Sequence, residues 1–119
     1  MIENCNFWEA KLSNSKFLSS KINKSIFTDA NLNNADFSKS EIKNTNLSHA
    51  NLRGANFKTS KLIKVNLRDA VFDEKTNWPK NFNPKKYGAI EYKNFNPFSY
   101  SRKLSYNTIK SLSLKEIRE

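Results

Sequence analysis

The carboxylate, hydroxyl and imidazole side chains are the first candidates for catalytic chemistry in this sequence. Asp29, Asp36 and Asp69 could supply a general acid and base, and His49 could activate a serine nucleophile. Each of them, however, occupies a fixed place in a five-residue pattern that runs through most of the chain. The aspartates and His49 fall where the pattern points outward or turns a corner, and the serines fall where it points inward: Ser15, Ser40 and Ser60. We therefore predict no catalytic residues and expect a protein that is not an enzyme.

Metal and cofactor sites are not supported by the composition. One cysteine and one histidine cannot supply a typical structural zinc site, and the single Cys5 excludes an intramolecular disulfide. Two glycines, Gly54 and Gly88, are too few for a glycine-rich phosphate loop. Cys5 occupies one of the small, inward places of the pattern, so we interpret it as a core residue. We expect no cofactor.

The five-residue pattern pairs one large with one small residue. Every fifth position is Leu, Ile or Phe, and a compact residue lies two positions before each of them from Cys5 onward. The large positions are Ile2, Phe7, Leu12, Phe17, Ile22, Phe27, Leu32, Phe37, Ile42, Leu47, Leu52, Phe57, Leu62, Leu67 and Phe72. The small positions are Cys5, Ala10, Ser15, Ser20, Ser25, Ala30, Ala35, Ser40, Thr45, Ala50, Ala55, Ser60, Val65 and Ala70.

A period of five fits neither an α-helix nor a flat strand. Apolar residues recur about every 3.6 positions on a helix face and every second position on a strand face. A coil with corners can use a period of five if each unit forms one side of a four-sided turn, with the large and the small residue pointing inward. Successive coils would then stack at the inter-strand distance of about 4.8 Å.

Residues twenty positions apart are of the same kind, which independently favours four units per coil. Phe17, Phe37 and Phe57 fall into one column, and Ile22 and Ile42 fall into another. The third column contains Leu32 and Leu52, and the fourth begins with Phe7 and Phe27. We predict that Phe17, Phe37, Phe57, Ile22, Ile42, Leu32 and Leu52 form the structural core, with aromatic ladders inside.

The tripeptides Ala30-Asn31-Leu32 and Ala55-Asn56-Phe57 show the motif that carries a family resemblance. The pattern resembles the pentapeptide-repeat family, whose consensus is Ala, Asp or Asn, Leu and two variable residues. The resemblance covers about residues 2–74 and implies an all-β fold, a right-handed quadrilateral β-helix of just under four coils over residues 1–74. The ending Trp78-Pro79, Phe82-Asn83-Pro84 and Gly88-Ala89 is similar to the one found after many such repeats, especially in cyanobacterial members.

A solenoid needs caps, because each end leaves an open core and an open sheet edge. Over residues 75–90 we predict a C-terminal capping segment in which Trp78, Phe82 and Tyr87 cover the last core residues. At the other end the repeat starts at residue 2 without a helical lead-in.

Large apolar residues at outward positions gather in the sequence around the first coil. They are Trp8, Leu18 and Ile26, and Ile63 is the main exception further along. Two interpretations are open: covering of the edge by the chain's own termini, and a surface for a partner or for self-association.

The tail, residues 91–119, is basic and rich in aromatic residues. Residues 75–119 hold 10 basic and 3 acidic side chains, a balance of 10 − 3 = +7, and residues 108–118 could form one short helix. The candidate binding residues are Lys93, Phe95, Phe98, Tyr100, Arg102 and Lys103. Such a mixture can bind single-stranded nucleic acid, but we favour packing of the rings on the solenoid while the cations stay solvated.

One side of the predicted coil carries a stripe of lysines. Its outward positions are Lys21, Lys24, Lys43, Lys61 and Lys64, set against Glu3 and Glu41, while the next side carries Glu9, Asp29 and Asp69 against Arg68. A stripe of one charge either keeps a face solvated or attracts a partner of opposite charge.

Length and charge limit the remaining classes. The chain has 119 residues, 21 Lys and Arg against 11 Asp and Glu, and a formal charge of +10, which fits one domain. No segment is apolar enough to cross a bilayer, and the N-terminus lacks the charged and then apolar segments of a signal peptide. We therefore expect a cytoplasmic protein, which could be peripheral to a membrane-bound complex.

The leading hypothesis is a non-enzymatic protein–protein interaction or scaffold module. It would dock through its faces and basic tail to an acidic surface of another protein or complex, and its oligomeric state is open. The alternative is binding of nucleic acid or an anionic membrane by the tail. The family resemblance adds a third role, since some members mimic DNA and modulate gyrase, but those are long acidic rods and this chain is short and basic.

Overall fold

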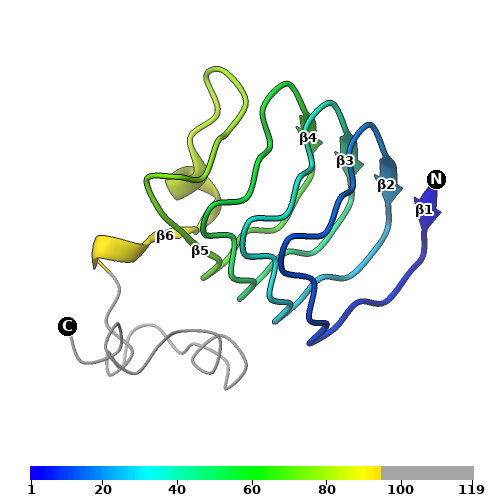
Figure 1. Ribbon diagram of the computed structural model, residues 1–119, viewed down its shortest axis with the longest axis horizontal. Helices are drawn as coiled ribbons and strands as arrows, with labels where there is room; N and C mark the ends of the chain where they lie inside the picture. The colour runs from blue at the N-terminus through cyan, green and yellow to red at the C-terminus, as the bar shows by residue number, and fades with distance from the viewer. Residues whose placement is uncertain (95–119) are drawn as a thin grey trace.

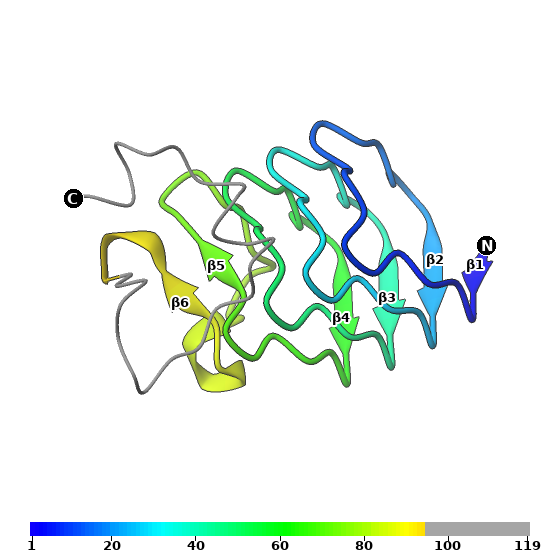
Figure 2. The same cartoon turned by 90° about the horizontal axis from the view of Figure 1, so that it is seen from below.

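The chain winds as a four-sided parallel β-helix, which confirms the predicted architecture. The computed structural model describes residues 1–94, so the predicted helix over residues 108–118 and the tail residues from Phe95 onward lie outside the described part. Successive coils lie side by side along one axis, from the N-terminal coil to the end that contains β5 and β6 (Figures 1 and 2).

One side of the coil carries the regular strands. β1 (Ile2–Glu3), β2 (Lys21–Asn23), β3 (Glu41–Lys43) and β4 (Lys61–Ile63) form a parallel sheet in that order. The register pairs Ile2 with Ile22, Ile22 with Ile42, and Ile42 with Leu62. The twenty-residue period expected from the sequence is therefore the inter-coil register.

The other three sides pair through single bridges with the same period. Asn6 pairs with Ile26, Lys11 with Asn31, and Lys16 with Asp36. On these sides the chain turns through an i to i+3 hydrogen bond, as when the Ala30 N–H donates to the Phe27 carbonyl at 3.0 Å. The strand side makes no such bond at the corners that follow Ile2, Ile22 and Ile42.

A residue with positive φ stands at each corner, two positions after each large residue from Ile2 to Leu67. Between Asn4 and Asp69 these φ values lie between 50° and 72°. The corner residues include Asn, Asp and Gly54, which tolerate this region, but also lysines and His49. His49 was predicted at an exposed corner; its φ of 59° confirms the corner, but the residue is half-buried.

Asn and Asp before the large residue brace the turns. The side-chain Oδ1 of such a residue accepts a hydrogen bond from the backbone N–H two residues on, as from Trp8 to Asn6 at 2.9 Å. The same bond is made by Asn31, Asp36, Asn46, Asn51, Asn56 and Asn66. At Asp36 the Ser38 hydroxyl adds a second bond of 2.7 Å, and these bonds lower the pKa of Asp36. The aspartate at this position is therefore explained by turn geometry.

The core contains the predicted ladders. Phe17, Phe37 and Phe57 stack with ring centroids 4.8 and 5.0 Å apart and interplanar angles of 3° and 5°. Phe7 stacks on Phe27 at 4.8 Å. The predicted core residues Ile22, Ile42, Leu32 and Leu52 are all buried. These spacings equal the distance between coils, so each ring meets its equivalent one coil away.

The small inward positions leave room for these rings. Ala30, Ala35, Ala50 and Ala55 are fully buried. Buried hydroxyls at the same positions donate to backbone carbonyls, as Thr45 does to Lys43 at 2.7 Å and Ser60 to Phe57 at 2.6 Å. They are space-fillers, as predicted, and they also satisfy their own hydrogen-bonding groups within the narrow interior.

The aromatic ladder continues into residues 75–90. Trp78 stacks on Phe57 at 4.9 Å, Phe82 on Trp78 at 5.3 Å, and Tyr87 on Phe82 at 4.9 Å. Trp78 and Phe82 pack against the buried core, whereas Tyr87 is half-exposed. These residues extend the predicted Phe ladder beyond the last repeat and cover its end.

The register changes by one residue where the repeat ends. Asn77 pairs with Asn56, a separation of 21, because one extra residue is accommodated in the bend before it. Thr76 holds this bend: its buried hydroxyl donates to the Leu52 carbonyl at 2.9 Å and accepts from the Asp73 and Gly54 N–H groups.

The described chain ends in a last pair of short elements. After the 3-10 helix η1 (Pro84–Tyr87), β6 (Ile90–Glu91) pairs with β5 (Val71–Phe72), and η2 (Tyr92–Asn94) follows. Residues 91–94, grouped with the tail in the sequence analysis, are therefore attached to the folded part. None of the helices within residues 1–94 has the length and apolar character needed to cross a membrane.

Removing one ring from the ladder tests its importance. Phe37 is fully buried between two stacked rings, so Phe37→Ala is expected to lower the free energy of unfolding by about 3–5 kcal/mol. Urea denaturation followed by circular dichroism measures this. Lys58→Ala, at an exposed position, is the control, and equal losses for the two variants would contradict the ladder.

The bend at Thr76 can be tested without changing side-chain shape. Thr76→Val leaves the Leu52 carbonyl and two N–H groups without this hydroxyl, and we expect a loss of about 1–3 kcal/mol. Ser13→Ala, which changes an exposed hydroxyl, should leave the urea midpoint unchanged. An unchanged midpoint for Thr76→Val would show that the hydroxyl does not hold the bend.

Candidate functional site

The outward residues of the strand side form a regular charged surface. We call this surface the lysine face and define it by Lys21, Lys24, Lys43, Lys61 and Lys64. The strands hold Lys21, Lys43 and Lys61, while Lys24 and Lys64 stand at the following corners. The structure brings all five predicted lysines to one side, and all but the half-buried Lys43 are exposed.

Glu41 lies in the middle of the lysine face. In the strand register it stands between Lys21 and Lys61. Its carboxylate forms an ion pair of 2.6 Å with Lys43 on the same strand. The hydrogen bond and charge of Lys43 lower the pKa of Glu41, and the cations of Lys21 and Lys61 lower it further. Lys43 is therefore engaged within the face, and the four other lysines flank a neutralised centre.

Polar side chains connect the coils at the N-terminal part of this surface. Asn23 donates from Nδ2 to the Glu3 carboxylate at 3.4 Å, and Asn44 donates to the Asn23 side-chain oxygen at 3.2 Å. Five lysines against Glu3 and Glu41 leave the face with 5 − 2 = +3. This surface is basic, as predicted, but its charges are interspersed with acceptors.

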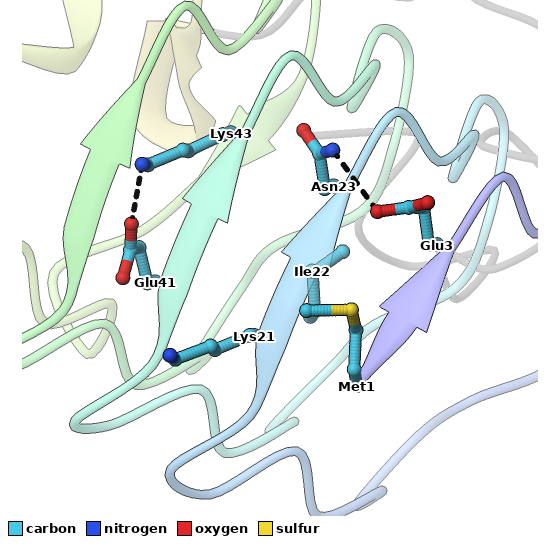
Figure 3. Close-up of a pocket in the computed structure, with 7 residues that line it drawn as sticks. All are labelled: Met1, Glu3, Lys21, Ile22, Asn23, Glu41 and Lys43. Carbon is cyan, nitrogen blue, oxygen red and sulfur yellow. Dashed lines mark hydrogen bonds and ion pairs between the residues drawn. The ribbon is translucent and has the colours of Figure 1, made fainter.

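A surface hollow of about 240 Å³ lies on the same side, over β1, β2 and β3. Figure 3 shows Met1 reaching across to Ile22, the Lys43–Glu41 pair on one side and Glu3 with Asn23 on the other. The lining residues are Met1, Glu3, Lys21, Ile22, Asn23, Glu41 and Lys43. The mixed lining fits contact with a polar, charged surface better than enclosure of an apolar ligand.

The lysines repeat with a two-coil spacing. Lys21 and Lys61 are separated by the strand that carries Glu41, and Lys24 and Lys64 are separated by Asn44. At the inter-strand distance, two coils correspond to about 10 Å. The lysine face therefore presents two pairs of lysines whose backbone positions are fixed by the stacked coils.

The exposed apolar residues do not form a single patch. Trp8 and Ile26 lie on the Phe7 side, where Ile26 bridges to Asn6, whereas Leu18 follows Phe17 on the opposite side of the coil. Ile63 lies on the lysine face, next to Lys43 in register. Trp8 and Ile26 therefore share one side and Leu18 lies on the opposite one, because a four-sided coil separates positions ten apart onto opposite sides.

The residues first considered for catalysis are dispersed along the solenoid. Asp29 and Asp69 stand at corners with φ of 62° and 56°, and Asp36 braces a turn. Cys5 is half-buried and its sulfur lies 3.4 Å from the Glu3 carbonyl. Among residues 1–94, no three His, Cys, Asp or Glu side chains are grouped so that they could hold a metal ion.

A second hollow, at the C-terminal end of the described chain, was not predicted from the sequence. Arg53 lies over the Tyr92 ring at 5.2 Å from its centroid, and Glu91 pairs with Lys85 at 3.4 Å and with Lys93 at 3.6 Å. The hollow is about 420 Å³ and is lined by Arg53, Asp73, Glu74, Lys75, Glu91, Tyr92 and Lys93. Its one signal in the sequence is Asp73-Glu74-Lys75, where the repeat is interrupted. Of the candidate tail residues only Lys93 falls in the described part.

Comparison with known proteins agrees with this architecture. The family model described as pentapeptide repeat region matches residues 1–76, so the chain belongs to the pentapeptide-repeat family. Proteins of this family are in general structural or interaction modules rather than enzymes. No curated protein sequence matches the chain.

Two solved structures are similar to it. A pentapeptide repeat protein from the thylakoid lumen of Arabidopsis thaliana has a TM-score of 0.64 and 28% identity, with 69% of this chain and 56% of that chain covered. The protein Rfr23 from the cyanobacterium Cyanothece 51142 has a TM-score of 0.53 and 26% identity, with 64% and 58% covered. The chain thus spans a little over half the length of each.

The electrostatics at Glu41 can be measured directly. Lys43→Met removes the hydrogen-bond donor and the nearest cation, so the pKa of Glu41 is expected to rise toward its usual value. Because the folded-state pKa is lowered, any stabilisation by Glu41 is present above the unfolded-state pKa and is lost as pH falls through the folded-state pKa. Carboxyl-detected NMR titration measures the pKa of Glu41 in the wild type and in Lys43→Met, with Lys58→Met as the control. A pKa that Lys43→Met leaves unchanged would contradict the assignment.

Proposed function

We propose that this protein is a non-enzymatic interaction module that docks through its lysine face to an acidic surface of a larger protein or complex. The observation that carries the proposal is the fixed grid of paired lysines on the side that carries the β1–β4 sheet. Because the backbone beneath is hydrogen-bonded from coil to coil, the lysines start from anchored positions and docking orders little additional chain.

The spacing of the cations defines the partner that fits. Lys21 and Lys61, about 10 Å apart, match carboxylates one heptad apart on an α-helix, which are separated by about 10.5 Å. Ile63 is 42% exposed on the same surface and, two residues from Lys61 on β4, offers an apolar contact beside that cation. An acidic helix with an apolar residue beside one of its carboxylates is therefore the occupant that this face favours, with charge setting the rate and register of docking.

A basic face also fits a surface that is simply solvated and binds no partner. The basic tail supports nucleic acid or an anionic membrane as an alternative partner. The two similar structures come from a thylakoid lumen and from a cyanobacterium. These sources support testing a photosynthetic or other large complex as the setting, with the cytoplasm or the periphery of a membrane-bound complex as the proposed location.

Charge reversal on two faces separates these possibilities. Full-length protein, the variant Lys21→Glu with Lys61→Glu, and the control Lys39→Glu with Lys58→Glu are used as bait with nuclease-treated lysate from the native cell. Both variants change the charge equally, but the control residues lie on the Phe17 side. We expect the control variant to capture the same partner as the wild type. The face variant should capture less of it by about tenfold or more, and added salt should weaken the capture.

Two outcomes would contradict docking through the lysine face. Equal capture by the two variants would remove the face from the interaction. Binding of single-stranded DNA or of phosphatidylserine vesicles at low salt, unchanged by the face variant and lost at high salt, would favour the alternative role of the tail.

A further inference from the structure

The N-terminal coil leaves the core open. Ile2, Phe7 and Leu12 are only partly buried, whereas Phe27 and Leu32, their equivalents one coil further on, are fully buried. In Figures 1 and 2 the N-terminus lies at the outer end of the stack, with no described segment across β1. The first coil therefore exposes an apolar ring where every later coil has a neighbour.

The backbone at this end is also unpaired among the described residues. In the second coil, Ile26 donates its N–H to the Cys5 carbonyl and accepts from the Phe7 N–H, so both its groups point to the coil before it. Asn6, Lys11 and Lys16 hold the equivalent positions in the first coil, and no residue within 1–94 pairs with their N–H or C=O groups. They form an open sheet edge on three sides, of the kind that invites another chain.

The opposite end is closed. Trp78 and Phe82 cover the core there, and Ile90, which pairs with Val71, is buried. An open end cannot pack on this covered end in the way that successive coils pack on each other. A second copy can therefore satisfy the open end only with its own open end, which gives a closed two-fold arrangement instead of a fibre.

The rim of the first coil is suited to a two-fold partner. Glu3 and Glu9 lie on one half of the rim, and Lys11 and Lys16 lie on the other. A two-fold axis that places the acidic half of one copy over the basic half of the other sets Glu3 beside Lys11 or Lys16. Trp8 and Leu18, 58% and 52% exposed on the same coil, widen the apolar contact.

We infer that the N-terminal coil, residues 1–20, is the interface of a head-to-head homodimer. In it the apolar ring of Ile2, Phe7, Leu12 and Phe17 meets the same ring of the second copy. Residues of the open edge exchange N–H to C=O hydrogen bonds in antiparallel pairs, and the rim charges select the rotation. A coil of 20 residues matches the roughly 20–30 residues that a standard interface uses on each side.

Two kinds of variant test the interface on the full-length chain by sedimentation equilibrium across a range of concentrations. Lys16→Pro removes an N–H that has no partner within residues 1–94, so it should block the edge without removing a described hydrogen bond of the monomer. We expect the wild type to show a concentration-dependent monomer–dimer equilibrium and Lys16→Pro to remain monomeric. Circular dichroism checks that the variant folds.

Charge changes give a second, independent measurement on exposed residues. Glu3→Lys should weaken the dimer by about tenfold, and adding Lys11→Glu with Lys16→Glu should recover most of that loss. Lys58→Glu, far from the first coil in sequence and exposed, is the control and should have no effect. A wild type that is monomeric at every concentration, as expected if the chain's own residues 95–119 cover the end, would overturn the inference. So would a dimer that none of these variants weakens.

Discussion

A left-handed backbone residue at every fifth position governs the geometry of this chain. An L-residue in that conformation costs about 1–2 kcal/mol, and half of the corners from Asn4 to Asp69 are neither Asn, Asp nor Gly. Nearly every corner N–H donates to a carbonyl of the next coil, as Glu9 does to Thr28 at 3.0 Å. Such a bond contributes about 1 kcal/mol net, which is of the same size as the cost of the corner. The corners are therefore stable only when coils are stacked, and the fold is a property of the stack.

The same constraint explains where the lysines gather. On three sides the turn uses an i to i+3 hydrogen bond, and at most of these corners Asn or Asp before the large residue braces it, although Lys11 and Lys16 hold the same position in the first coil. The strand side has no such bond, so Lys21, Glu41 and Lys61 can occupy the equivalent position. The charged surface thus lies on the side where no Asn or Asp precedes the large residue. Turn chemistry, as well as any partner, shapes the lysine face.

Most of the fold could be predicted because it is local and periodic. The spacing of five gave the inward positions, and the identity of residues twenty apart gave the number of sides. The pairing of Asn77 with Asn56 could not be predicted, because one inserted residue shifts the register only through the contacts of Thr76. Residues 92–94 have no periodic signal, and the contact of Tyr92 with Arg53 depends on tertiary structure.

The site was predicted less completely than the fold, for two different reasons. The sequence does contain the signal that Leu18 lies opposite Trp8, since positions ten apart fall on opposite sides of a four-sided coil. It also contains the signal that Glu41 and Lys43 share a face, since they are two apart on a strand. The sequence does not show how strong the Lys43–Glu41 ion pair is. Whether a lysine contacts its neighbour or faces solvent depends on rotamers and on the charges of adjacent coils.

The two surfaces are connected through the geometry of the four-sided coil. A rotation that sets Glu3 of one copy beside Lys11 or Lys16 of the other brings the strand side over a different side of the second copy. The two lysine faces of the inferred dimer would then point in different directions instead of merging into one long basic face. Such a dimer can engage two acidic sites at once, so its avidity depends on whether a partner presents them at matching angles. Rim charges on the first coil would in this way decide how the lysine faces are presented.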